Sequence, residues 1–256
     1  MNKYFDLLGQ VAVVTGASAG LGLQMAKALA SQGANLVLLA RREQRLVENA
    51  EQIVRDYGVD VLPLKCDITV ADEVKHAVQA TLDRFGRVDI LVNNAGTGAI
   101  GNAEDITDEQ FMHEVNVDLL GTFICAREFG REMIKAGYGR IINIASMYGL
   151  VGNMIAGSAP YHAAKGGVVN LTRALAAEWG KHGVTVNSIC PGYFYTELTT
   201  ATLDSEYFQD MAKRSIPLGR YGREGELDTC ALFLASRMSS YVNGQNIAVD
   251  GGFTCV

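Results

Sequence analysis

The sequence has little of what marks several classes of protein. No apolar run reaches the ~18 residues that a membrane-spanning helix needs. Residues 1–6 lack the charged region and the apolar run of a signal peptide. Cysteine is scarce, odd in number and never in Cys-x-x-Cys or Cys/His metal spacing. We therefore expect a cytoplasmic protein with no membrane partner and no metal site, in which the cysteines are small apolar residues: Cys66, Cys125, Cys190, Cys230 and Cys255.

An excess of basic charge is also missing. The chain has 22 Lys and Arg residues against 28 Asp and Glu, a formal net charge of −6 at pH 7. This balance argues against a general nucleic-acid surface and against an anionic-membrane surface. Hydrophobic residues make up 48% and charged residues 20% of the 256 residues. Such a composition is typical of a globular protein with a substantial core.

Apolar, β-branched runs alternate along the chain with segments of helical periodicity. The runs predict strands at 10–15, 35–40, 59–65, 89–93, 139–145, 184–189 and 246–249. The segments between them predict helices at 21–32, 42–57, 71–85, 108–136, 161–182, 205–214 and 225–234. This alternation predicts an α/β fold: one Rossmann-type domain over 1–256, with a doubly wound parallel sheet of about seven strands and helices on both faces.

A glycine-rich loop joins the first predicted strand to the first predicted helix. Its sequence is Thr15-Gly16-Ala17-Ser18-Ala19-Gly20-Leu21-Gly22. Glycine lets a backbone turn tightly and approach a ligand closely, and a helix N-terminus offers free N–H groups and a positive dipole end to a phosphate. The loop therefore favours a dinucleotide site, although a plain strand-to-helix turn would also need glycine.

The end of the second strand indicates which dinucleotide is bound. NAD sites usually carry an acidic side chain there for the ribose 2′-hydroxyl. This chain has Ala40, Arg41 and Arg42 at that place and no acid before Glu43. A guanidinium can bind a 2′-phosphate in a bidentate manner, which favours NADP(H) over NAD(H). The alternative is an arginine pair at the start of a solvated helix.

Tyr161 and Lys165 are four residues apart in a predicted helix, so both side chains lie on one face. A Tyr hydroxyl normally titrates near pH ~10, and a neighbouring ammonium stabilises the phenolate. The pair is therefore a candidate proton-transfer device. Taken alone, the same spacing also arises by chance on solvated helices.

With these features, the chain resembles the short-chain dehydrogenase/reductase family over essentially its whole length. Six motifs carry the resemblance: Thr15-Gly16-x-x-x-Gly20-x-Gly22, Asn93-Asn94-Ala95-Gly96, Asn116, Ser146, Tyr161-x-x-x-Lys165 and Pro191-Gly192-x-x-x-Thr196. The resemblance implies an oxidoreductase that interconverts a secondary alcohol and a ketone by hydride transfer with NAD(P). Within the family the chain is similar to the gluconate 5-dehydrogenase and 3-oxoacyl-carrier-protein reductase branch.

The resemblance implies four catalytic residues. Tyr161 would be the general acid/base, and Lys165 would activate it and bind the nicotinamide ribose. Ser146 would hold the substrate oxygen, and Asn116 would complete a water-linked proton relay through Lys165. Ser146 could instead cap a strand end, Asn116 could simply bend its helix, and Ser158 is a minor rival to Ser146.

The resemblance also implies a set of cofactor-binding residues. Asp67 would lie beside the adenine, unless it only forms an Asx turn, and Thr196 would contact the nicotinamide carboxamide. Ala19 stands where members that use NADP(H) often carry a basic residue, which leaves the 2′-phosphate to Arg41 and Arg42. The predicted set is Thr15, Gly16, Ser18, Gly20, Leu21, Gly22, Arg41, Arg42, Asp67, Ile68, Asn93, Ala95, Gly96, Tyr161, Lys165, Pro191, Gly192 and Thr196.

The substrate is less well defined by the sequence. Residues 193–216 mix aromatic and charged side chains and are expected to cover the site as a lid. The loop 147–160 is about two residues longer than is usual in the family, and Asn153, Arg214 and Arg220 could meet a small anion or could be ordinary surface residues. A sugar acid or polyol is the first expectation, with a 3-oxoacyl-carrier-protein, another ketone or a hydroxysteroid as alternatives. A non-catalytic NADP(H) sensor or scaffold is the alternative of another class, and the resemblance suggests a homotetramer or dimer.

Overall fold

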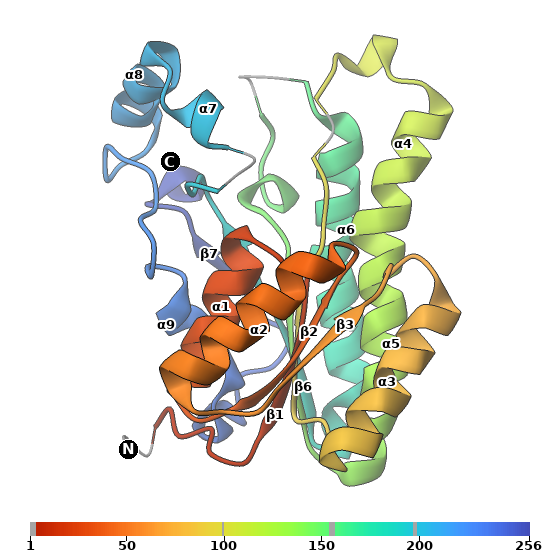
Figure 1. The fold of residues 1–256 in the computed structure, drawn as a ribbon. Helices are drawn as coiled ribbons and strands as arrows, with labels where there is room; N and C mark the ends of the chain where they lie inside the picture. Colours follow the sequence, from red (N-terminus) through yellow and green to blue (C-terminus); the bar gives the residue numbers. More distant parts are fainter. Residues whose placement is uncertain (1–3, 99, 154–156, 197–198) are drawn as a thin grey trace.

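Seven parallel strands form the centre of the molecule (Figure 1). The computed structural model describes residues 4–98, 100–153, 157–196 and 199–256. The strands lie in the order β3-β2-β1-β4-β5-β6-β7. They are β1 (Val11–Thr15), β2 (Asn35–Ala40), β3 (Val61–Lys65), β4 (Ile90–Asn93), β5 (Gly139–Ile144), β6 (Val184–Pro191) and β7 (Asn246–Val249). Every neighbouring pair is parallel, as the predicted doubly wound fold requires.

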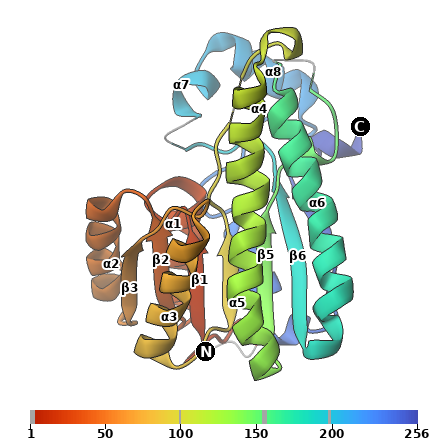
Figure 2. The ribbon, with the colours of Figure 1, turned by 90° about the vertical axis from the view of Figure 1, so that its right-hand side faces the viewer.

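Helices cover both faces of the sheet. The contacts place α1 (Gly20–Ser31), α2 (Glu43–Tyr57) and α9 (Asp228–Ala235) on one face. On the other face lie α3 (Ala71–Phe85), α5 (Thr122–Ala136) and α6 (Ala159–Trp179), which stand in front of the sheet in Figure 2. Because successive side chains of a strand point to opposite faces, β1 contributes to both cores. Val14 packs with the α1 side and Val13 with the α5 side.

One long helix was predicted at 108–136, and the structure divides it into three parts. The first is α4 (Asp108–Glu114), the second is a π-helical stretch η2 (Val115–Gly121), and the third is α5. The Thr122 hydroxyl donates to the Asp118 carbonyl at 2.7 Å. A π turn adds a residue to the helical repeat, so side chains after it point in directions that regular α-helical spacing does not predict.

The remaining elements are short. They are η1 (Ala103–Asp105), η3 (Met147–Gly149), η4 (Gly180–His182), α7 (Thr200–Leu203), α8 (Glu206–Ser215), η5 (Arg237–Ser239) and η6 (Phe253–Cys255). α7 and α8 lie above the carboxyl ends of the strands, on the same side of the molecule as α4 (Figure 1). The sequence predicted α8 but not α7 or the single turns, which are too short to show a period.

The sheet brings the predicted motifs to one edge. The chain order reverses between β1 and β4, which are neighbours in the sheet. In open parallel sheets a ligand binds at this switch point, outside the carboxyl ends of the strands. None of the helices in the described ranges is long and apolar enough to cross a membrane. All five cysteines are free: Cys66, Cys125 and Cys190 are buried, Cys230 is half-buried and Cys255 is exposed.

Candidate active site

The loop after β1 forms a cradle that only glycine can build. Gly16 has φ of +67°, and a Cβ there would lie 2.8 Å from the side-chain nitrogen of Asn94. A Cβ on Gly22 would lie 2.4 Å from the same nitrogen. Among the residues that the structure describes, no side chain caps the N-terminus of α1. The first amides of α1 are therefore available to an anion, which fits the pyrophosphate of a dinucleotide.

Two side chains from the α2 region, those of Arg42 and Asn49, support this loop through hydrogen bonds to Ser18. The Arg42 guanidinium donates to the Ser18 hydroxyl from Nε at 3.1 Å and from Nη2 at 3.0 Å. The Asn49 amide donates to the Ser18 carbonyl at 3.1 Å. Arg42 was predicted to bind the cofactor directly. The structure places it on Ser18, so it acts on the loop itself.

Arg41 lies on the other side of β2, near Asp67. One Asp67 oxygen accepts the Thr69 N–H at 3.0 Å and the Thr69 hydroxyl at 2.7 Å, which is the Asx turn considered as an alternative. Burial alone would raise the pKa of Asp67, but the Thr69 hydrogen bonds and the charge of Arg41 outweigh it and lower that pKa. The Ile68 side chain is buried and packs against Gly121, so its side chain belongs to the core.

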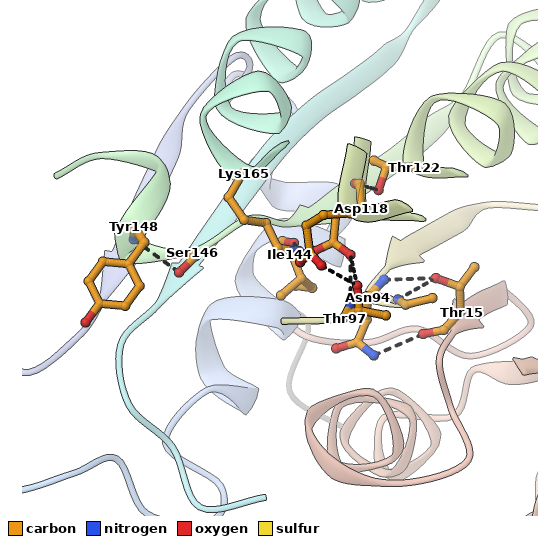
Figure 3. A network of polar contacts seen from close by, with 11 residues as sticks. Thr15, Asn94, Thr97, Asp118, Thr122, Ile144, Ser146, Tyr148 and Lys165 are labelled. Atoms are coloured by element: carbon orange, nitrogen blue, oxygen red, sulfur yellow. Dashed lines mark hydrogen bonds and ion pairs between the residues drawn. The ribbon is translucent and has the colours of Figure 1, made fainter. Parts of the chain in front are cut away.

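The loop after β4 is tied to the glycine loop (Figure 3). The Thr15 hydroxyl accepts the N–H of Asn94 at 2.9 Å and the N–H of Ala95 at 3.0 Å. The Asn94 amide donates back to the Thr15 carbonyl at 3.1 Å. These bonds place Ala95 and Gly96 beside the cradle, at the carboxyl edge of the sheet, as expected for residues that follow β4.

Asn93 does not share that position. Its side chain is buried and donates to the Asn143 side-chain oxygen at 2.9 Å, between β4 and β5. The Asn93 side chain is thus engaged within the sheet, and the contact of Asn93 with the cofactor stays a prediction. It is Asn94, one residue later, whose side chain reaches the glycine loop, because neighbouring residues at a strand end point to opposite sides.

The end of β6 completes the edge. Pro191 is the last residue of β6, and the Gly192 N–H donates to the Val249 carbonyl at 3.0 Å. A Cβ on Gly192 would lie 2.7 Å from the Asp250 Cα, so the two segments touch. A Cβ on Gly20 would lie 3.6 Å from the Thr196 Cβ. Thr196 is thus within reach of the glycine loop, as its predicted role requires.

Ser146 and Lys165 lie on neighbouring elements. Ser146 follows β5, is 6% exposed, and its Oγ accepts the Tyr148 N–H at 3.1 Å, so its own O–H can still donate. The turn η3 packs on α6 so closely that a Cβ on Gly149 would lie 2.7 Å from the Lys165 carbonyl oxygen. The Lys165 Nζ lies 5.6 Å from the centre of the Tyr161 ring. The rival Ser158 has its hydroxyl on the His162 ring at 3.2 Å.

The partner of Lys165 was not predicted. The Lys165 ammonium donates to the Ile144 carbonyl at 3.1 Å and forms an ion pair with Asp118 at 2.9 Å, as Figure 3 shows. Asp118 is fully buried. Among the described residues, no hydrogen bond is made by the side chain of Asn116, which was predicted to complete the relay. The structure places Asp118 at Lys165 instead; Asn116 lies two residues earlier, and residues two apart in a helix do not share a face.

Comparisons with known proteins show the family to which the chain is similar. A family model described as enoyl-(acyl carrier protein) reductase matches residues 16–254. Gluconate 5-dehydrogenase of Gluconobacter oxydans is 39% identical over 250 residues, which cover 98% of this chain and 96% of the relative.

The protein belongs to the short-chain dehydrogenase/reductase family.

Relatives in this family use either nicotinamide cofactor. An NAD-dependent glycerol dehydrogenase of Listeria innocua is 35% identical over 258 residues, with 99% of this chain and 97% of the relative covered. A gluconate 5-dehydrogenase from Burkholderia cenocepacia, solved with NADP and tartrate, has a TM-score of 0.94 and 37% identity over 99% of this chain and 98% of the other. The predicted family, fold and enzyme class are confirmed. The protein is an NAD(P)-dependent oxidoreductase acting on CH–OH groups.

Aromatic side chains cluster around Tyr148, two residues after Ser146. The Tyr148 ring lies 4.8 Å from the His162 ring and 6.3 Å from the Phe253 ring, between centres. The Tyr148 hydroxyl is hydrogen-bonded to the Tyr193 hydroxyl. Burial raises the pKa of both phenols. These groups remain neutral hydrogen-bonding partners rather than charged ones.

Two of the predicted anion contacts are already paired. The Arg220 guanidinium binds both carboxylate oxygens of Glu226 at 2.7 Å, and Arg214 pairs with Asp210 at 2.7 Å. Residues 154–156 of the longer loop and residues 197–198 of the proposed lid lie outside the described residues.

Sequence reasoning missed four polar residues that the site uses: Asn49, Asn94, Thr97 and Asp118. A signal for the last of them was present. Glu114 and Asp118 are two acids four residues apart in the helical segment that ends at Ala136, which contains Asn116. Two acids one turn apart and both buried, 1% and 0% exposed, require a cation nearby.

Proposed function

We propose that the protein interconverts the alcohol and ketone forms of a sugar acid or polyol with NADP(H), using Tyr161 as the general acid/base. One observation carries the proposal. Lys165, one turn after Tyr161, is buried with its ammonium 5.6 Å from the Tyr161 ring. The same ammonium is bound to the Ile144 carbonyl, two residues before Ser146. Contacts of the Lys165 ammonium thus hold Tyr161 and the strand end that carries Ser146 close to each other.

The residues of the chain would divide the work as follows. The bound nicotinamide supplies or accepts the hydride. Ser146 donates a hydrogen bond to the substrate oxygen, where negative charge develops during reduction. Tyr161 gives a proton to that oxygen in reduction and takes it back in oxidation. Lys165 stabilises the phenolate form of Tyr161, because opposite charges at short range favour each other.

The preference for NADP(H) rests on Arg41. Arg41 directly follows β2, which is next to β1 in the sheet, and residues at this place usually meet the adenosine ribose of a dinucleotide; its charge also acts on Asp67. A guanidinium would bind a 2′-phosphate there more tightly than a ribose hydroxyl. Arg42 supports the same site indirectly, through Ser18.

The substrate class rests on the relatives and on the lining of the site. The named relatives act on gluconate and on glycerol. The hydroxyl groups of Tyr148 and Tyr193 and the ring of His162 lie together, and Tyr148 is two residues after Ser146. Such groups can hydrogen-bond several hydroxyls of a small polyol, and aromatic faces pack against its C–H groups. Paired Arg214 and Arg220 provide less support for an anion than the sequence suggested.

A cofactor-linked assay tests the proposal. NADPH and NADH oxidation are followed with sugar-acid ketones, open-chain ketoses, a β-ketoacyl thioester and a steroid ketone. Turnover of the first two groups with NADPH is the expected result. Turnover confined to the thioester or the steroid would assign a different substrate class, and cofactor binding without any turnover would favour a sensor.

A further inference from the structure

The ion pair at Lys165 is part of a larger buried polar cluster. Asp118 lies 2.9 Å from the Lys165 ammonium and is fully buried. Its other oxygen accepts the Thr97 N–H at 2.7 Å and lies 3.4 Å from the Thr97 hydroxyl. Glu114, 1% exposed, lies 2.9 Å from the same hydroxyl. One lysine and two acids are thus buried together, and the half-buried Thr97 links the two acids.

Counting protons shows how these groups can coexist. The Thr97 hydroxyl has one hydrogen but two carboxyl groups within reach. If both acids were ionised, the single hydroxyl hydrogen could serve only one carboxylate, and the other oxygen–oxygen contact would have no hydrogen between its atoms. A protonated Glu114 resolves this, because it can donate to Thr97, and Thr97 can then donate to Asp118. Burial and the charge of Asp118 act in the same direction and raise the pKa of Glu114, although Thr97 and Lys165 oppose them.

The packing around Asp118 holds this arrangement in place. A Cβ on Gly96 would lie 3.0 Å from the Asp118 carboxylate, so the loop after β4 closes over it. A Cβ on Gly167 of α6 would lie 2.7 Å from the Leu119 side chain, which brings the π turn against α6. Asp118 therefore has little room to leave Lys165 (Figure 3).

We propose that Asp118 is the positioning residue that keeps Lys165 charged and in place beside Tyr161, with a protonated Glu114 behind it. This inference rests on the proposed role of Tyr161 and Lys165. It assigns to Asp118 the place that the sequence motif suggested for Asn116. The Asp118 carboxylate is fully buried and paired with Lys165, so we expect it to act through Lys165.

The sign of the effect follows from the surroundings of Lys165. Burial opposes the positive charge, but Asp118 and Tyr161 outweigh it, and the pKa of Lys165 is raised. Among the described residues, Cys190 of β6 is a further titratable group that interacts with Lys165, and burial raises the pKa of its thiol. Without the carboxylate, burial would dominate, and Lys165 would lose its proton at a lower pH. Activity at alkaline pH would then be lost earlier.

Asp118→Asn tests this, because it keeps the shape and removes the charge. Lysine side-chain NMR of the whole protein, with the Lys165 signal assigned by comparison with Lys165→Arg, follows the titration without any turnover. We expect the Lys165 titration, and the alkaline limit of kcat, to move down by about one pH unit or more. Asp72→Asn is the matched control, since its lysine pair at 2.8 Å is exposed and should leave both quantities unchanged.

A second variant covers the case in which Asp118→Asn does not fold. Thr97→Val removes the hydroxyl and keeps the N–H to Asp118, so a smaller shift in the same direction is expected. An unchanged Lys165 titration in the folded variants overturns the proposal, as does a uniform loss of kcat at all pH values. An infrared band of a protonated carboxyl at neutral pH that disappears in Glu114→Gln supports the protonated state, and its absence in the wild type contradicts it.

The two proposals fail separately. If no alcohol is oxidised by the wild type, the proposed function falls, but the NMR titration still decides the role of Asp118. If turnover is normal and the Lys165 titration does not move, only the role of Asp118 falls.

Discussion

The Asn94 side chain donates to the Thr15 carbonyl at 3.1 Å and thereby joins the loops after β4 and β1, two strands that are neighbours in the sheet but far apart in the sequence. The amide occupies the space beside Gly16 and Gly22. Asn94 thus shapes the floor of the cofactor cradle. Cofactor binding should therefore be sensitive to any atom added at the glycines.

Gly16→Ala should weaken the binding of both nicotinamide cofactors strongly. The new Cβ would lie 2.8 Å from Asn94 and 2.9 Å from Ala95, and the backbone has φ of +67°. Gly58→Ala is the matched control, because Gly58 has φ of +68° but nothing within 4 Å of the new Cβ. Both variants carry similar backbone strain, of order 1–3 kcal/mol. Fluorescence titration with NADPH should separate them, and equal affinities would show that close packing at Gly16 is unimportant.

Arg41 and Arg42 should have different effects on cofactor choice. Arg41→Ala should raise the Kd for NADPH by about 10–100-fold and leave the Kd for NADH nearly unchanged, because it removes a charged hydrogen-bond donor from the 2′-phosphate only. Arg42→Ala should weaken both cofactors alike, since Arg42 holds Ser18 of the loop. Calorimetric titration of both variants with both cofactors measures this. Equal losses for NADPH and NADH in Arg41→Ala would contradict the assignment.

Asp228 should make stability fall as pH rises. Burial and Glu224 outweigh a hydrogen bond from Gln24 and raise the pKa of Asp228 to about 6. The folded state then holds this proton at a pH where the unfolded chain, in which the pKa of Asp228 is near its ordinary value of 3.8, has lost it. The free energy of unfolding therefore falls as the pH rises from about 4 to about 6.

Asp228→Asn should for this reason stabilise the protein at pH 7 by about 1 kcal/mol, a modest value because the side chain is partly exposed. Thermal unfolding should show a Tm higher by about 2–4 °C at pH 7. Near pH 4 the variant and the wild type should melt together. A lower Tm at pH 7, or the same gain at both pH values, would show that Asp228 is not held in this state.

Much of the fold followed from apolar runs and helical periods. Strands buried on both faces, such as β1 with all five residues buried, leave a plain signal in the sequence. The bounds of β2, α3 and β7 agree with the predicted ranges. α7, with four residues, left no comparable pattern.

The site was harder to predict where a single residue decides the outcome. Asn116 and Asp118 are two residues apart in one helical segment, and only the tertiary structure shows which one reaches Lys165. Asn93 and Asn94 differ by one residue at a strand end, and only the strand register shows which one is buried. The sequence does not distinguish the roles of Arg41 and Arg42, but in the structure the Arg42 guanidinium is hydrogen-bonded to Ser18, 24 residues earlier in the chain. Such contacts depend on tertiary packing, which periodicity does not contain.

The central claim is that Tyr161 transfers the proton. Its most direct test is the turnover of Tyr161→Phe with NADPH and the best ketone of the panel, beside the cofactor affinity of the same variant. Tyr138→Phe serves as the control, because Tyr138 adjoins the opposite end of β5, where its hydroxyl contacts Gln10. We predict that Tyr161→Phe lowers kcat by at least ~10² while NADPH still binds. Turnover near that of the wild type would contradict the account.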